Sequence, residues 1–145
     1  MSNHPTRDDA LALLHEYTKS DSLRRHALGV EQAMLKMAEK YGGNLNEWGI
    51  AGLLHDFDYE MYPTMEEHPY KGNEILKDKG YPESICKAIM GHATYTGIPR
   101  DTDMAKALFS VDELTGFIFA VTYVRPSRSI FEVQPKSVKK KLKQK

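Results

Sequence analysis

The sequence predicts an all-α protein, a bundle of about six helices with a basic C-terminal segment. Apolar residues recur every three or four positions along nearly the whole chain, which is the period of an amphipathic helix. Prolines and several glycines, among them Gly42, Gly80 and Pro82, fall between the periodic stretches and mark turns. No alternating run is long enough to require a sheet, although residues 120–124 are strand-like in composition. A chain of 145 residues suffices for one domain.

The first three helices are expected in the N-terminal half of the chain. Residues 6–17 place their apolar side chains on one side, and Thr6 suits the start of that helix. Asp21 is expected to cap a long second helix, which Gly42 ends. Asn46 is expected to cap a third helix, apolar on most sides and therefore buried.

Three more helices are expected in the second half. Pro69 suits the first turn of a fourth helix, which ends at Gly80. Pro82 opens a fifth helix. After a polar loop, a sixth helix runs from about Thr102 to the stop before Pro126.

Composition excludes several classes of protein. The chain is 41% hydrophobic and 28% charged, its mean hydropathy is −0.54, and its longest apolar stretch is far too short to span a bilayer. The early aspartates Asp8 and Asp9 do not fit a secretory signal, so we expect a cytoplasmic protein without a membrane partner. Cys86 is the single cysteine, which rules out an internal disulfide and a cysteine-rich zinc site. Any metal must therefore be held by histidine and carboxylate side chains.

The formal charge of zero conceals two parts of opposite sign, and we expect a domain over residues 1–124 followed by a basic segment over residues 125–145. That segment holds eight basic residues against one glutamate, a net charge of +7, and leaves −7 on the first 124 residues. A solvated helix explains the segment most simply, and a nucleic-acid-binding tail is the alternative. The absence of aromatic residues after Phe131 argues against stacking on single strands, so we do not expect a nucleic-acid partner.

Two carboxylates interrupt the apolar pattern of expected helices. Asp56 follows His55 directly after the apolar run of the third helix, and Asp112 lies on or beside the apolar stripe of the sixth. Burying a carboxylate costs several kcal/mol unless it is paired or binds a metal. A salt bridge would satisfy either one alone, but both on one small bundle suggest a shared cation.

Three histidines offer further ligands. His26 lies on the inward stripe of the second helix, His68 precedes the fourth helix and His92 ends the fifth. Each has a structural explanation by itself, as a hydrogen-bonded core residue, a cap or a cation near a helix C-terminus. Together with His55 they provide four imidazoles that could converge with the two carboxylates.

The order of these six residues resembles the H...HD...H...H...D pattern of the HD-domain superfamily of metal-dependent phosphohydrolases. The flanking segments AGLLHDFD, HPYKGNEIL and ALFSVDELTG are similar to those around the family's motif residues. The resemblance extends over residues 23–122, most of the chain.

The resemblance implies a dinuclear site, in which one metal is held by His26, His55, Asp56 and Asp112. Asp56 would bridge to a second metal bound also by His68 and His92. The implied cofactors are two divalent transition metals, iron or manganese first, with cobalt, nickel or zinc as alternatives. His55 and Asp56 would be the catalytic pair, and a hydroxide bridging the metals would attack phosphorus.

The expected substrate is a small phosphorylated molecule such as a nucleotide. Lys71, Arg100 and Arg125 are candidates to contact its phosphate, although each is also explained as a solvated surface charge. The set of six is similar to that of small dinuclear HD enzymes that cleave dinucleoside polyphosphates. Relatives acting on cyclic dinucleotides carry a glycine and a lysine after the His-Asp pair, where this chain has Asp58 and Tyr59. A catalytically silent module that binds metal and nucleotide is the alternative function, and the sequence predicts no oligomeric state.

Overall fold

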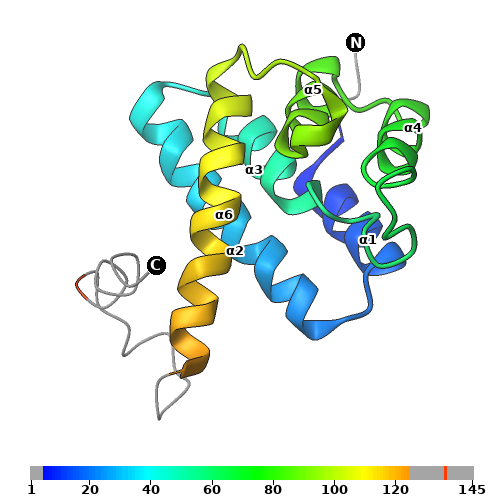
Figure 1. Ribbon diagram of the computed structural model, residues 1–145. Coiled ribbons are helices and arrows are strands. Elements are labelled where there is room, and N and C mark those ends of the chain that lie inside the picture. Colours follow the sequence, from blue (N-terminus) through cyan, green and yellow to red (C-terminus); the bar gives the residue numbers. More distant parts are fainter. Residues whose placement is uncertain (1–4, 125–135, 137–145) are drawn as a thin grey trace.

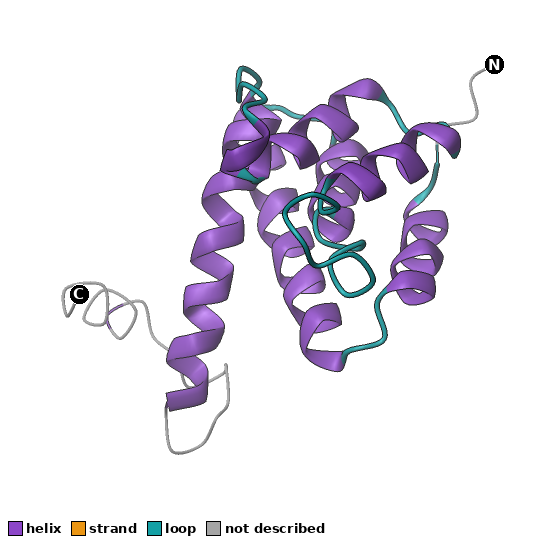
Figure 2. Ribbon diagram, turned by 45° about the vertical axis from the view of Figure 1, so that its right-hand side comes forward, coloured by secondary structure: helices purple, strands orange, loops and turns teal. Residues whose placement is uncertain are grey.

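The computed structural model describes residues 5–124 and 136, and helices are its only regular secondary structure there (Figure 1). The expected all-α class with six α-helices is confirmed. In chain order the elements are α1 (Arg7–Tyr17), α2 (Asp21–Tyr41), α3 (Leu45–Leu54), α4 (Tyr70–Asp78), α5 (Glu83–His92), the 3₁₀ turn η1 (Thr94–Thr96) and α6 (Asp103–Val124). Figure 2 shows the long loop that joins α3 to α4. No helix within residues 5–124 combines the length and hydropathy that a membrane crossing requires.

Side-chain caps set the starts of the first three helices, and two of the expected caps were misplaced. Thr6 caps α1 as expected, within a capping box. Ser20, rather than Asp21, caps α2, and Asn44, rather than Asn46, caps α3. In both cases the true cap has extended backbone and accepts a hydrogen bond from the amide three residues later, so it stands just before the first helical residue.

The remaining helix boundaries follow the proline and glycine signals closely. Pro69 and Pro82 each stand immediately before the first residue of α4 and α5. Gly42 ends α2 in the left-handed conformation with φ 73°, which glycine adopts without strain. Residues 120–124 belong to α6, so the strand-like composition there does not produce a strand.

The central helix of the bundle is α3, which packs against α1, α2, α5 and α6 (Figure 1). Its residues Leu53 and Leu54 are fully buried. Gly52 allows α2 to approach closely, because a Cβ at this position would lie 3.0 Å from the Cα of Glu31 and from the carbonyl oxygen of Val30. The end of α3 therefore lies deep in the bundle, and the residue that follows it is enclosed.

An ion pair between the half-exposed Arg7 and the buried Glu31 attaches α1 to α2. Glu31 is 1% exposed, and its carboxylate accepts two hydrogen bonds from the Arg7 guanidinium at 2.6 Å and 3.0 Å. The sequence analysis did not identify this pair, because Glu31 occupies a helix position that resembles an ordinary solvated one. Glu31 can therefore be buried because Arg7, on another helix, neutralises its charge, and the local sequence pattern does not reveal this partner.

Candidate metal centre

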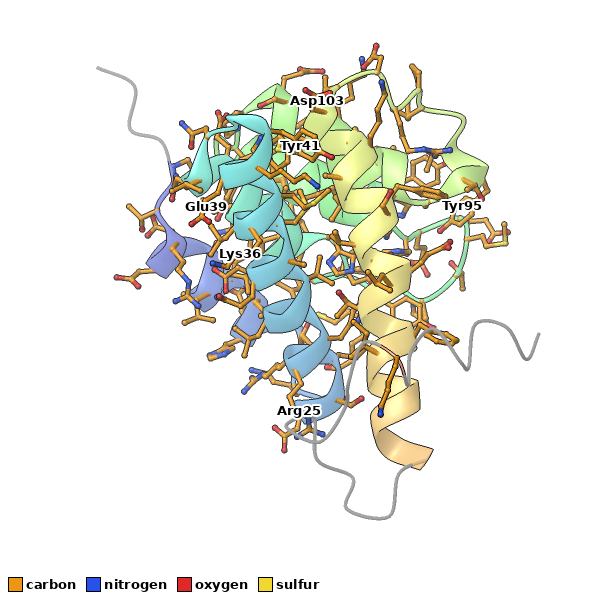
Figure 3. All side chains as sticks on the ribbon, turned by 90° about the vertical axis from the view of Figure 1, so that its left-hand side faces the viewer. Arg25, Lys36, Glu39, Tyr41, Tyr95 and Asp103 are labelled. Carbon is orange, nitrogen blue, oxygen red and sulfur yellow. The ribbon has the colours of Figure 1, made fainter. Side chains whose placement is uncertain are left out.

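The structure brings all six predicted ligand residues together at the centre of the bundle. They come from every helix except α1, either from the helix itself or from the residues next to one end: His26 in α2, His55 and Asp56 after α3, His68 before α4, His92 at the end of α5 and Asp112 in α6. Figure 3 shows α2 and α6 lying side by side, the two helices that carry the first and the last of these residues.

One group of side chains gathers around Asp112. The Nε2 atoms of His26 and His55 lie 2.8 Å and 3.0 Å from the same oxygen, Asp112 Oδ1. His55 Nε2 is also 3.3 Å from Asp56 Oδ2. Each of these four residues offers a ligand atom within 4.8 Å of the others.

A second group gathers around the other oxygen of Asp56. The Nε2 atoms of His68 and His92 lie 3.2 Å and 3.0 Å from Asp56 Oδ1. Asp56 therefore directs Oδ2 toward His55 in the first group and Oδ1 toward the second group. A carboxylate in this position could bridge two cations.

The spacing of these atoms fits shared metal ions. Bonds of about 2.1 Å at right angles place neighbouring ligand atoms about 3.0 Å apart. The nitrogen–oxygen distances within the two groups span 2.8 Å to 3.3 Å, as adjacent ligands of one ion would. Imidazole nitrogen and carboxylate oxygen together suit divalent transition metals.

Hydrogen bonds fix the ring orientation of three of the four histidines. The Nδ1 of His55 lies 2.7 Å from the Gly52 carbonyl oxygen, and the Nδ1 of His92 contacts the Ile89 carbonyl oxygen. A carbonyl only accepts, so Nδ1 carries the hydrogen and Nε2 faces the carboxylates. The Nδ1 of His68 lies 2.6 Å from a carboxylate oxygen of Asp58. These rings are held ready to ligate through Nε2.

Asp58 is a site residue that the sequence analysis did not assign. It is 1% exposed, and its Oδ2 accepts a hydrogen bond from the Gly72 amide at 2.9 Å while Oδ1 holds His68. Gly72 is required for this contact, because a Cβ there would lie 2.7 Å from Oδ2. The available signal was a second carboxylate two residues after Asp56.

Charges across the centre stabilise one another against burial. Burial disfavours the charge on Asp56, but the charge of His55 and hydrogen bonds from the histidines outweigh it and hold the pKa of Asp56 well below its usual range. The same balance lowers the pKa of Asp112 and raises the pKa of His55 well above normal. Burial also opposes the charge on His68, yet its carboxylate partners raise its pKa to about 9. Without metal, His55 and His68 therefore hold protons that a bound cation would replace.

The ligand side chains of the centre differ in their exposure to solvent. The side chains of His26, Asp56 and Asp112 are 20%, 26% and 21% exposed, whereas His55 is fully buried and His68 nearly so. His26 and the two carboxylates are therefore the members of the centre most accessible to a ligand.

The three predicted phosphate contacts remain predictions. Lys71 is exposed on α4. Arg100 donates a hydrogen bond to the Gly91 carbonyl at 2.9 Å and lies over the Phe109 ring, 4.1 Å from its centroid. Arg125 and most of the basic segment lie outside the residues that the structure describes.

Comparison with protein families accounts for the arrangement. A family model described as HD domain matches residues 23–115, a range that contains all six side chains. The chain belongs to the HD-domain family. This HD domain is 29% identical over 119 residues to the bis(5'-nucleosyl)-tetraphosphatase, symmetrical, of Staphylococcus aureus (strain NCTC 8325 / PS 47), a match that covers 72% of this chain and 59% of the relative. The chain thus spans about three-fifths of the length of that curated relative. No solved structure matches this HD domain significantly.

Proposed function

We propose that this HD domain is a metal-dependent phosphohydrolase that uses two divalent transition metals to cleave a nucleotide or another small phosphate ester. The observation that carries the proposal is Asp56, whose two carboxylate oxygens face two separate groups of imidazoles. A structural zinc site would need only one such group. The shared carboxylate is typical of a pair of ions, as found in enzymes that displace groups at phosphorus.

His26, His55, Asp56 and Asp112 would hold one metal, and Asp56 with His68 and His92 would hold the second. The nitrogen-rich ligand set favours iron or manganese, with cobalt, nickel or zinc as alternatives, over magnesium. When bound, two such ions supply positive charge to a phosphate group and lower the pKa of a coordinated water toward neutrality.

Charge explains why both metals would be needed. The centre contains three carboxylates, Asp56, Asp58 and Asp112, with a total charge of −3. Each divalent cation adds +2 to this centre, so the second ion makes it more attractive to phosphate than one ion alone. Activity should therefore depend on occupation of the second site.

The residues of the chain hold the ligand atoms in place. His55 and His92 are oriented by backbone carbonyls, and Asp58 orients His68. Because these contacts exist before substrate binds, little rearrangement is needed during the reaction. The match to a relative named as a nucleotide tetraphosphatase supports a nucleotide as substrate.

Metal analysis combined with a substrate panel tests the proposal. Protein purified without chelator should contain close to two transition-metal ions per chain. It should hydrolyse at least one member of a panel of phosphomonoesters, phosphodiesters and dinucleoside polyphosphates supplied with iron, manganese or cobalt. Less than one ion per chain would refute the metal centre. Tight nucleotide binding without hydrolysis under all three metals would instead favour the regulatory module.

Two substitutions separate the roles of the metals. Asp56→Ala should abolish both metal occupancy and activity, because both groups share this residue. His68→Ala should retain one metal and lose most activity. His15, exposed on α1, provides the matched control, and His15→Ala should change neither. If His68→Ala turns over substrate like the wild type, the two-metal mechanism is wrong even if the first site is right.

A further inference from the structure

Two exposed tyrosine rings lie directly against the second group of ligands. The ring of Tyr59 meets the ring of His68 edge to face, with centroids 5.5 Å apart and an interplanar angle of 81°. The hydroxyl of Tyr95, in η1, donates a hydrogen bond to the backbone carbonyl of the same His68. The two tyrosines nevertheless remain 43% and 40% exposed. Both rings are therefore fixed beside the proposed metal site and open to solvent.

Large exposed side chains concentrate around this part of the chain. Of the nine large hydrophobic side chains that are exposed within the described residues, five lie between residues 59 and 95: Tyr59, Met61, Met65, Tyr70 and Tyr95. Tyr41, on α2, is the comparable exposed tyrosine elsewhere, and Figure 3 shows it on the opposite side of α6 from Tyr95. Exposed aromatic rings beside a polar site are typical of ligand-binding surfaces.

The contacts of Tyr95 limit what it can offer a ligand. Its hydroxyl proton is already donated to the His68 carbonyl, so Tyr95 offers a ligand its aromatic ring and an accepting oxygen but no donor. Aromatic faces stack on nucleobases, and such stacking contributes about 1–3 kcal/mol per base. Because every base has a π-face, the interaction favours nucleotides over phosphates without a base but selects weakly among bases.

We propose that Tyr59 and Tyr95 form the base-binding wall of the site, so that the substrate is a nucleotide whose base stacks on these rings while its phosphates lie at the metal centre. The inference rests on the proposed function, since the metals bind the phosphate part. It is carried by the contact of the Tyr59 ring with the His68 ring and by the hydrogen bond from the Tyr95 hydroxyl to the His68 backbone, which join the exposed aromatic side chains to the ligand set.

A pair of non-hydrolysable probes tests the wall. Binding of α,β-methylene adenosine diphosphate and of methylenediphosphonate to the manganese-loaded protein would be measured by calorimetry, because the two probes share a phosphonate and differ in the nucleoside. Tyr59→Leu and Tyr95→Leu should each weaken binding of the nucleotide probe at least fivefold and change binding of the base-free probe less than twofold. Tyr95→Phe retains the ring and should bind the nucleotide probe like the wild type.

The control is Tyr41→Leu, which removes a tyrosine of similar exposure away from the centre and should leave both affinities unchanged. Equal weakening of both probes by the leucine variants, or no weakening of either, would overturn the wall. So would a wild-type protein that does not bind the nucleotide probe. Hydrolysis of the panel of phosphomonoesters, phosphodiesters and dinucleoside polyphosphates by the wild type reports separately on the proposed function. Selective loss of nucleotide binding without any turnover by the wild type would support the wall and refute the enzyme.

Discussion

Asp58→Asn is the most informative single change, because it keeps the size of the side chain and removes only its charge and half of its accepting capacity. The Asp58 carboxylate accepts two hydrogen bonds, from His68 Nδ1 at 2.6 Å and from the Gly72 amide at 2.9 Å. An asparagine has one accepting oxygen and one donating NH₂ group. It therefore accepts a hydrogen bond from one of these two donors and places its own NH₂ donor against the other.

The outcome for metal binding follows from the orientation of the amide. If the asparagine oxygen accepts from Gly72, the NH₂ group faces His68 Nδ1, which must then become an acceptor. The ring hydrogen moves to Nε2, the atom that faces Asp56, and His68 can no longer ligate through it. The opposite orientation places NH₂ against the Gly72 amide. Losing one hydrogen bond to a charged group costs about 1.5–3 kcal/mol, and loss of such a supporting partner lowers metal affinity about 10- to 100-fold.

Metal titration measures this loss directly. After dialysis against a weak chelator, the wild type should retain two ions per chain and Asp58→Asn close to one, with most of the hydrolysis lost. Asp101→Asn is the matched control, because Asp101 is 56% exposed and pairs with Lys87 at the surface. Binding of two ions by Asp58→Asn with unchanged affinity would refute the role of Asp58 in orienting His68.

Three further outcomes follow from the structure. Arg7→Met should lower the free energy of unfolding by about 2 kcal/mol in a urea titration, because it leaves Glu31 buried without its partner. If Glu31→Gln and the Arg7→Met, Glu31→Gln double variant lose the same free energy of unfolding, the effect of Arg7→Met comes from its pairing with Glu31. An Arg7→Met variant as stable as the wild type would contradict this role. Gly52→Ala should cost about 1–3 kcal/mol, because its Cβ would press on the backbone of α2, and an unchanged melting temperature would mean that the helices separate easily. The pKa of His68 is about 9 in the metal-free protein, above its ordinary value of 6.5, so its ion pairs stabilise that state fully below pH 6.5 and lose this effect as pH rises through 9. Metal affinity should accordingly increase as the pH rises from 6.5 to 9, because binding releases the proton of His68. Calorimetry in buffers of different ionisation enthalpy detects this release. A metal affinity independent of pH would contradict the prediction.

The fold was predictable from the sequence because helical periodicity and turn residues agree along the chain. The apolar repeat identified all six helices, and glycine and proline located most of their ends. The errors were at the caps of α2 and α3. At each start, two residues of a type that can cap a helix stand within two positions of each other, such as Ser20 and Asp21. Choosing between them needs the backbone conformation at each position, which a sequence pattern does not contain.

The ligand set was predictable from the polar interruptions of apolar stripes, whereas the residues that support it were not. Asp56 and Asp112 stood out because each follows or interrupts an apolar pattern. Asp58 and Tyr95 act through contacts with His68 that join separate segments of the chain. Such contacts depend on how the loops after α3 and α5 fold, and no local pattern determines that path.

The position of the metal centre follows from the ends of helices. The last carbonyl groups of a helix lack partners within it, and the C-terminus carries a partial negative charge. His55 follows α3 and His92 ends α5, and each ring donates Nδ1–H to a carbonyl three residues earlier, in the last turn of its own helix. This hydrogen bond thus satisfies a carbonyl that lacks a helical partner, fixes the tautomer of the histidine and leaves Nε2 free to bind a metal. The negative C-termini of α3 and α5 favour a cation nearby. His26 and Asp112 lie within helices and lack this support, so they depend on each other across α2 and α6, at 2.8 Å. The ligands from α2 and α6 are therefore positioned by contacts across the bundle, whereas His55 and His92 are positioned by their own helix ends.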